Sequence, residues 1–203
     1  WAVANAEPGQ NTQGLSVGIV EFDPGVSDDT ASHRRDNVFP QIRKAEARYL
    51  PFLLRQTLIG SNQWGVVRIM PKYSASADLL VRGKILQSNG HALKLHIWAE
   101  DSAGRTWLDK EYFGLAQTPD VEGERVRVEP FLAIYKLISE DLLSARAVLS
   151  DAELALIPSL SSLRYGAEIL PEFFSEYLSK NDAGNYVIKR MPARNDPMLS
   201  RIE

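Results

Sequence analysis

The sequence predicts an α/β (α+β) two-layer sandwich, in which a mixed β-sheet is covered by helices on one face. Three observations lead to this fold class. A strand-like run is followed by a helix and a second strand, three further strands are separated only by turn residues, and a long helix comes after them. Within this fold we expect a flexible N-terminal tail at residues 1–14, an α/β domain at residues 15–149, and a C-terminal helical extension at residues 150–203 that packs on the domain.

The first half of the domain alternates between strand and helix. Residues 15–22 (LSVGIVEF) alternate well and end at an Asp-Pro-Gly turn, which is typical of a strand. Residues 40–58 have helical periodicity, and Pro51 is expected to kink this helix. Residues 64–70 (WGVVRIM) are predicted to form the second strand. The apolar stripe expected to bury this helix consists of Ile42, Ala45, Tyr49, Phe52 and Leu53.

A three-stranded antiparallel meander is expected next, because two turn signals interrupt a long run of strand-forming residues. A three-residue loop at 88–90 (SNG) would pair Ile85 with Leu93. A two-residue Asn-Gly turn is the alternative, but it would place Lys84 opposite Leu95 and mix the two faces of the sheet. A four-residue loop then closes the second hairpin. The pairs that it sets on one face are Trp98 with Trp107, His96 with Asp109, and Lys94 with Glu111.

The rest of the chain is predicted to be mainly helical. Residues 129–149 repeat apolar side chains at helical spacing, and Pro130 suits the first turn of a helix. Short helices at 151–157 and 170–178 and a small strand at 186–189 are expected to follow. This last stretch is too short for a core of its own, so we expect it to pack on the sheet.

Composition and motifs exclude several kinds of chemistry. The net charge of −3 makes nucleic acid an unfavourable partner, and no apolar run approaches the roughly 20 residues of a membrane-spanning helix. With no cysteine and three scattered histidines, disulfides, thiolate nucleophiles and zinc sites are not expected. Because glycine-rich phosphate loops and the G-x-S-x-G elbow are also missing from the sequence, we expect no cofactor and no catalytic residue.

The outer face of the predicted meander is the first candidate binding site. The register gathers Leu80, Arg82, Trp98 and Trp107 there, and tryptophans at the end of a sheet often anchor an interface or a planar ligand. The alternative, which we favour, is that aromatic residues of the C-terminal segment cover these tryptophans within the chain itself.

Two charged clusters are further candidates. Arg48 and Arg55 belong to a basic stripe on the first helix, which would suit an anionic partner, although an exposed helix face carries charges in any case. Asp23, Asp28 and Asp29 are the best candidates for a divalent cation, because their loop leaves the carboxyl end of a strand. The loop lacks the ligand spacing of a calcium site, which favours a solvated loop.

Five stretches of the sequence carry a resemblance to a known family. In the order LSVGIVEF (15–22), LLRQTLIGS (53–61), WGVVRIMP (64–71), ADLLVRGKI (77–85) and HALKLHIWAEDSAGRTWLDKEYF (91–113), they resemble the small α/β domain of bacterial envelope proteins. This domain occurs at the N-terminus of TolB and in LpoB- and CsgG-type lipoproteins. The resemblance covers residues 15–149 and implies a periplasmic, non-enzymatic domain that docks onto other envelope proteins. The sequence departs from the family in having no lipidated cysteine and in residues 150–203, which have no counterpart there.

The leading hypothesis is therefore a non-catalytic binding or scaffold domain of the bacterial cell envelope, with protein partners. We expect it in the periplasm or at the periphery of the outer membrane. Ala4-Asn5-Ala6 before Glu7 has the form of a signal-peptidase site, which favours export. The alternative is a hydrolase, or a nucleotide- or metal-dependent enzyme, with its site in the loop at residues 23–36.

Overall fold

The computed structural model describes residues 14–26, 39–117 and 129–193. Its main sheet has five strands in the order β2-β1-β3-β4-β5, in which β1 is parallel to both of its neighbours and β3, β4 and β5 form an antiparallel meander. The elements are β1 Val17–Val20, α2 Pro40–Gly60, β2 Val67–Met70, β3 Leu79–Ser88, β4 Ala92–Asp101, β5 Thr106–Leu115, α3 Leu132–Ala147, α4 Asp151–Ile169, α5 Pro171–Phe174, the 3-10 turn η1 Ser175–Tyr177, and the hairpin of β6 Leu178–Lys180 and β7 Tyr186–Ile188.

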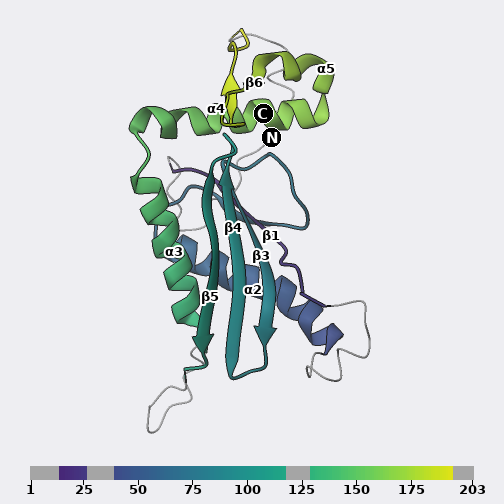
Figure 1. The fold of residues 1–203 in the computed structure, drawn as a ribbon, viewed down its shortest axis with the longest axis vertical. Coiled ribbons are helices and arrows are strands. Elements are labelled where there is room, and N and C mark those ends of the chain that lie inside the picture. Colours follow the sequence, from purple (N-terminus) through teal and green to yellow (C-terminus); the bar gives the residue numbers. More distant parts are fainter. Residues whose placement is uncertain (1–13, 27–38, 118–128, 194–203) are drawn as a thin grey trace.

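Helices α2 and α3 lie on one face of the sheet, and no described helix covers the opposite face, which we call the open face (Figure 1). Alternate strand residues such as Ile19, Val81 and Ile97 meet Leu54 of α2 and Ile138 of α3 in one hydrophobic core. The predicted fold class, a two-layer sandwich with a mixed sheet and helices on one face, is confirmed.

The buried face of α2 differs from the predicted one. The helix buries Ala47, Leu50, Leu54 and Leu58, which recur every three or four residues. Of the stripe that was expected to face the core, only Leu53 is buried, whereas Ile42, Ala45, Tyr49 and Phe52 are exposed. Both sets have helical spacing, so periodicity alone does not decide which of them meets the sheet.

Pro51 gives α2 a point of attachment to the first strand. A proline within a helix leaves the carbonyl four residues before it, here that of Ala47, without its helical partner. The backbone N–H of Phe22, just beyond β1, donates to this carbonyl at 3.0 Å. The helix and the strand are therefore joined by a hydrogen bond that the proline makes possible.

The first hairpin of the meander is displaced from its predicted register. Ile85 pairs with Leu95 rather than with Leu93, and an irregularity in β3 follows this pair. At the turn, the side chain of Asn89 accepts hydrogen bonds from the N–H groups of His91 and Ala92, at 3.1 and 2.9 Å. Up to this irregularity, the displacement by two residues keeps the side chains on their faces of the sheet, so the hydrophobic pattern fits both registers.

The second hairpin is displaced in the same way. Trp98 lies opposite Asp109, and His96 lies opposite Glu111. The predicted charge pairs are wrong as directly opposed partners, but they are in contact as diagonal neighbours. His96 Nε2 is 2.6 Å from Asp109 Oδ1, and Lys94 Nζ is 2.6 Å from Glu111 Oε2. Long side chains reach such diagonal positions readily.

The elements after α3 also differ from the prediction. The expected helix at 151–157 continues through Pro158 to Ile169, and the helix expected at 170–178 is reduced to α5 and one 3-10 turn. The strand expected at 186–189 is present as β7. At the N-terminus of α4, Ser150 and Glu153 form a reciprocal capping box, which satisfies backbone N–H groups of the first turn.

Helix α4 lies across one end of the sheet (Figure 1). The hydroxyl of Ser102, in the β4–β5 turn, donates to the carbonyl of Ile157 at 2.5 Å, and the Ile157 side chain is part of the main core. Within the ranges described above, no helix combines the length and the apolar character needed to cross a membrane.

Tyr135 of α3 offers a test of the core. It is fully buried, and no described residue forms a hydrogen bond with its hydroxyl group. Burial raises the pKa of this hydroxyl, so it stays neutral. Because an unpaired buried hydroxyl costs about 1–3 kcal/mol in lost hydration, we expect Tyr135→Phe to raise the free energy of unfolding in urea by up to about 1 kcal/mol.

The matched variant for this test is Tyr112→Phe. The Tyr112 hydroxyl is also in a buried residue, but it donates to Asp141 Oδ2 at 2.7 Å. Its removal should lower the free energy of unfolding by about 1.5 kcal/mol, because a hydrogen bond to a carboxylate is lost. Equal losses from the two variants would show that the Tyr135 hydroxyl has a partner.

Candidate functional site

The open face presents alternate residues of β3, β4 and β5. Its central row consists of Arg82 of β3, Trp98 of β4 and Asp109 of β5, which lie opposite one another. The next row contains Lys84, His96 and Glu111. Cations therefore lie on the β3 side and carboxylates on the β5 side, and the indole of Trp98 stands between them.

The rings of His96 and Trp98 are stacked, with centroids 3.9 Å apart and 17° between their planes. Residues two apart in a strand point to the same face, so the strand itself brings the rings together. The contact of His96 Nε2 with Asp109 Oδ1 holds the imidazole in place beside the indole. Both rings remain partly exposed, so the face carries a pre-positioned aromatic surface.

Leu80 and Arg82 differ in exposure on this face, since Leu80 is buried and Arg82 is exposed. Leu80 is buried in a small cluster with Met70 and Ala77, on the part of the sheet that β1, β2 and β3 form. Arg82 is exposed beside Trp98. Of the residues predicted for this face, Arg82 and Trp98 are the pair that the structure brings together at the surface.

Trp107 lies on the side of the core, which corrects the predicted tryptophan pair. An irregularity of the β4–β5 ladder leaves Trp107 as an extra residue in β5 and turns its side chain away from Trp98. The Trp107 ring is buried 6.4 Å from that of Trp64, and its Nε1 donates to Asp101 Oδ2 at 3.0 Å. A bulge of this kind breaks the alternation of faces and leaves no periodic signal in the sequence.

Trp107 is buried within the chain, as the favoured alternative expected, but the aromatic residues of the described C-terminal segment are not part of its cluster. It lies in the main core, which contains residues of the sheet and of helices α2 and α3 together with Ile157 of α4. The aromatic side chain of Phe174 instead packs on Gly166 of α4, where a Cβ would lie 2.7 Å from the ring. The C-terminal segment thus forms a local cluster with α4, and Trp98 stays partly exposed.

The basic stripe of α2 is divided between two roles. Arg55 Nε donates to the carbonyl of Val67 at 2.9 Å and so holds the edge strand β2 against the helix. Arg48 is 76% exposed, with its Nε 3.6 Å from Glu21 Oε2. Exposed ion pairs of this length contribute little to stability, so Arg48 is available for contact with a partner.

The predicted cation loop is described only in part. Asp23 Oδ1 accepts a hydrogen bond from the N–H of Gly25 at 2.8 Å, and its Oδ2 is 3.5 Å from Lys84 Nζ. Asp28 and Asp29 lie outside the described residues. Within the described ranges, no group of three or more histidine, aspartate or glutamate side chains is placed to hold a metal ion.

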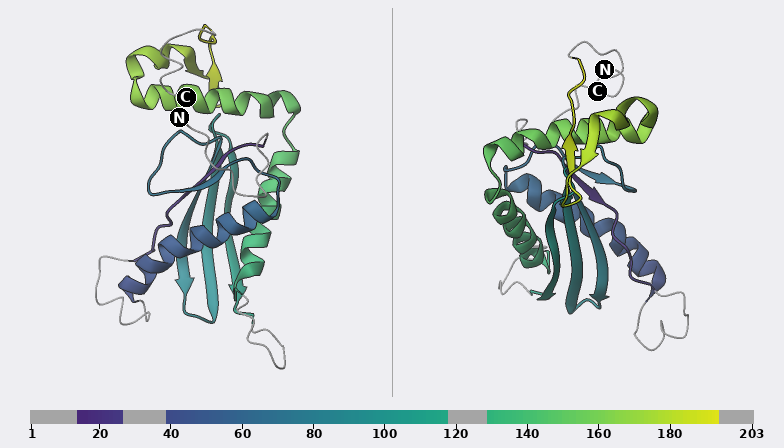
Figure 2. Two further views of the ribbon diagram at one scale, coloured as in Figure 1. Left: turned by 180° about the vertical axis from the view of Figure 1, so that it is seen from behind. Right: turned by 45° about the horizontal axis from the view of Figure 1, so that its top comes forward.

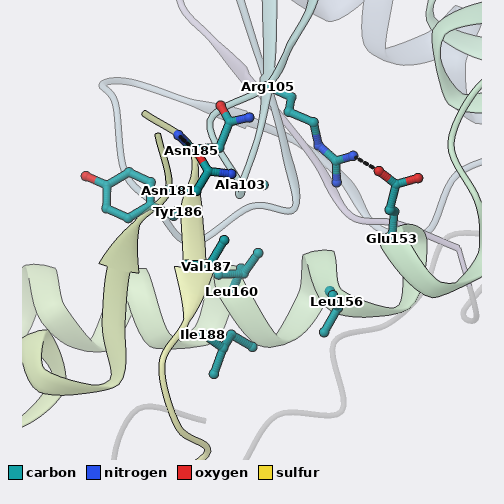
Figure 3. A pocket seen from close by; sticks show the side chains of 10 residues that line it. All are labelled: Ala103, Arg105, Glu153, Leu156, Leu160, Asn181, Asn185, Tyr186, Val187 and Ile188. Atoms are coloured by element: carbon teal, nitrogen blue, oxygen red, sulfur yellow. Dashed lines mark hydrogen bonds and ion pairs between the residues drawn. The ribbon is translucent and has the colours of Figure 1, made fainter. Parts of the chain in front are cut away.

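A pocket of about 380 Å³ lies between the β4–β5 turn, α4 and the β6–β7 hairpin (Figure 3). Its apolar side is formed by Leu156, Leu160, Val187 and Ile188. Figure 3 shows the ion pair of Arg105 and Glu153 at one end and Tyr186 toward the other. The backbone N–H of Tyr186 donates to the carbonyl of Ala103 at 2.7 Å, which anchors the hairpin to the turn.

The polar groups of this pocket are engaged in holding the structure together. Arg105 Nη1 is 2.6 Å from Glu153 Oε1, while hydrogen bonds from the backbone and side chain of Ser150 lower the pKa of Glu153. Asn181 Oδ1 accepts from the N–H groups of Ala183 and Asn185. No sequence pattern predicts this pocket, because its walls come from segments about 80 residues apart that meet only in the fold.

Comparison with known proteins adds no assignment. No protein-family model matches the sequence, and no curated protein matches it at a significant level. What the geometry offers is an aromatic pair on a sheet face that no described helix covers, framed by charges of opposite sign, which is an arrangement suited to binding.

Proposed function

We propose that the chain is a non-catalytic binding domain that docks a protein partner on the open face of its sheet. The observation that carries this proposal is the stacked pair of His96 and Trp98 at the centre of a face that no described helix covers. A partly exposed tryptophan held in place by its neighbours is a typical anchor of a protein interface.

The charges around Trp98 support a protein as the ligand. Arg82 on one side and Asp109 on the other give the face a positive and a negative flank. A partner with the reverse arrangement would be oriented by these flanks, and mismatched partners would be repelled. This is a means of selecting one protein surface, and it fits the scaffold role that the sequence pattern suggests.

The proposed location is the bacterial cell envelope. It is supported by the resemblance of residues 15–149 to the small α/β domain of envelope proteins. The described order of strand, helix, strand, meander and helix is consistent with that pattern. In fractionated cells, recovery of the full-length protein in the cytoplasm would overturn the location and leave the binding surface to be tested separately.

The expected result for Trp98→Ala is a loss of about 30-fold in affinity for the partner, which corresponds to a hot-spot contribution of about 2 kcal/mol. The measurement uses the full chain as bait in an envelope extract, followed by titration of the captured protein. Phe113→Ala is the control, because this exposed ring is on the same face but farther along the strands. If Trp98→Ala retained the partner with unchanged thermal stability, the open face would not be the docking surface.

A further inference from the structure

Helix α2 has a second apolar face that points away from the core. Ile42, Ala45, Tyr49 and Phe52, which we call the α2 stripe, follow one another at intervals of three, four and three residues. Ile42 is 56%, Tyr49 53% and Phe52 38% exposed, and the rings of Tyr49 and Phe52 are stacked with centroids 6.3 Å apart. The opposite side of the same helix, with Ala47 and Leu54, is buried in the core.

No described segment covers the α2 stripe. Seen from behind the sheet, α2 crosses in front of the strands, with α3 beside it and nothing described over it (Figure 2). Exposed apolar side chains scattered singly are ordinary, but a continuous row that includes two stacked rings marks an interaction surface. The row also has the three–four spacing of a seam between two packed helices.

The exposed charges that α2 itself places beside the stripe are positive, and one of them, Arg48, has its Nε 3.6 Å from Glu21 Oε2 just beyond β1. Lys44 and Arg48 are exposed on α2, and the exposed residues of this helix include no aspartate or glutamate. Glu46 is turned inward, where its Oε1 accepts from Ser88 Oγ at 2.6 Å and its Oε2 is 3.5 Å from Arg43 Nε. The surface is therefore an apolar row with a positive flank.

A hollow continues the stripe at its N-terminal end. A pocket of about 490 Å³ lies between the start of α2 and the β3–β4 turn, with Phe39 and Ile42 on its apolar wall and Arg43 and Glu46 on its polar wall. This volume accommodates one large side chain of a helix laid along the stripe. The groove and the row of side chains thus form one continuous surface.

We propose that the α2 stripe docks an acidic amphipathic helix of a partner protein. The partner's apolar row would pack between the side chains of the stripe, and its flanking carboxylates would pair with Lys44 and Arg48. A second copy of the chain fits less well. In an antiparallel pair of α2 helices, the flank with Lys44 and Arg48 on one copy would face the same flank on the other, and these like charges would repel. This surface lies on the opposite side of the sheet from Trp98 and does not depend on the function proposed for the open face.

The test uses two synthetic helical peptides that share leucines at three–four spacing. One peptide carries glutamates beside the leucines, and the other carries lysines at the same positions. Binding to the full chain is measured by fluorescence anisotropy, with vesicles of phosphatidylglycerol and phosphatidylethanolamine as a third probe. The variants are Lys44→Glu/Arg48→Glu and Tyr49→Ser/Phe52→Ser, with Arg82→Glu as a matched charge reversal on the open face.

The expected result is binding of the acidic peptide alone, weakened about tenfold or more by each double variant and unchanged by Arg82→Glu. Because all four substituted side chains are exposed, the variants should keep the circular dichroism spectrum of the wild type. Equal binding of both peptides, or no binding of either, would overturn the proposal. Binding of the vesicles without the acidic peptide would assign the stripe to a lipid surface instead, and a dimer lost in Tyr49→Ser/Phe52→Ser would assign it to a second copy.

Discussion

Asp101→Ala is expected to lower the free energy of unfolding by about 3–4 kcal/mol. The Asp101 carboxylate is 1% exposed at the end of β4. Its Oδ1 accepts from the N–H groups of Ala103 and Arg105, and its Oδ2 accepts from Arg105 Nε and Trp107 Nε1, all at 2.9–3.1 Å. Alanine would leave the buried donors of Ala103 and Trp107 without an acceptor, and Arg105 would lose the partner that fixes it in the turn.

The measurement for Asp101 is equilibrium unfolding in urea, followed by tryptophan fluorescence. Asp101→Asn should lower the free energy of unfolding by less than Asp101→Ala, because the amide oxygen can still accept from the N–H groups of the turn. Some loss remains, because the NH₂ group of asparagine would face the donors of Arg105 and Trp107 and cannot accept from them. Asp109→Ala, with a carboxylate exposed on the neighbouring strand, should cost less than about 1 kcal/mol. A loss at Asp101 no larger than that at Asp109 would mean that the buried carboxylate does not organise the turn.

The same substitution should also loosen the C-terminal hairpin. Asp101 shapes the turn whose Ala103 carbonyl receives the N–H of Tyr186, so the anchor of β7 depends on it. We expect Asp101→Ala to speed proteolytic cleavage near the β6–β7 hairpin more than near α2.

The second large effect is expected at Leu54 of α2. Leu54 is fully buried in the main core, whereas Phe52, two residues earlier, is 38% exposed on the α2 stripe. Leu54→Ala should therefore lower the free energy of unfolding by about 2–5 kcal/mol, through lost burial and the cavity that remains. Phe52→Ala removes more atoms but should cost less than about 1 kcal/mol, because much of its ring already contacts water.

The pair of α2 variants decides which face of the helix meets the sheet. Urea unfolding of Leu54→Ala and Phe52→Ala under the same conditions gives the comparison directly. If Phe52→Ala were the more destabilising variant, the predicted stripe of Ile42, Tyr49 and Phe52 would be the core face, and the docking proposal for it would fall. The expected order would show that the Leu54 side of α2 stabilises the core and that the α2 stripe on its other side is a surface.

Sequence periodicity was sufficient for the elements but not for their faces or register. The strand at 15–22, the helix from residue 40 and the meander all lie where the pattern placed them, because alternation and helical spacing are local properties. Helix α2, however, carries two apolar rows, and only packing selects the one that contains Leu54. Up to its irregularity, each hairpin of the meander is displaced by two residues, which keeps the side chains of this part on their predicted faces.

The prediction of the candidate sites succeeded where it depended on local alternation and failed where it depended on bulges or on contacts between distant segments. Trp98 and Arg82 were correctly expected together on one face. They lie on neighbouring strands in the regular part of the hairpin, where side chains alternate between the two faces without interruption. The prediction for Trp107 was wrong because a bulge in β5 turns its side chain to the other face. Arg55 donates to the carbonyl of Val67 in the edge strand β2, a contact that helical periodicity does not reveal. The pocket beside Tyr186 had no sequence signal, because it needs three separate segments in place.

By itself, the sequence determined the α/β class, the sites of most helices and strands, and the alternation that puts Trp98 and His96 on one face. These features follow from the period of side chains along a strand or a helix, which neighbouring residues define. Only the tertiary structure decided that Trp107 joins the core, that Arg55 binds the edge of β2, and that no described segment covers the α2 stripe. Each of these depends on which surfaces meet, and that is settled by the packing of the whole chain rather than by any local pattern.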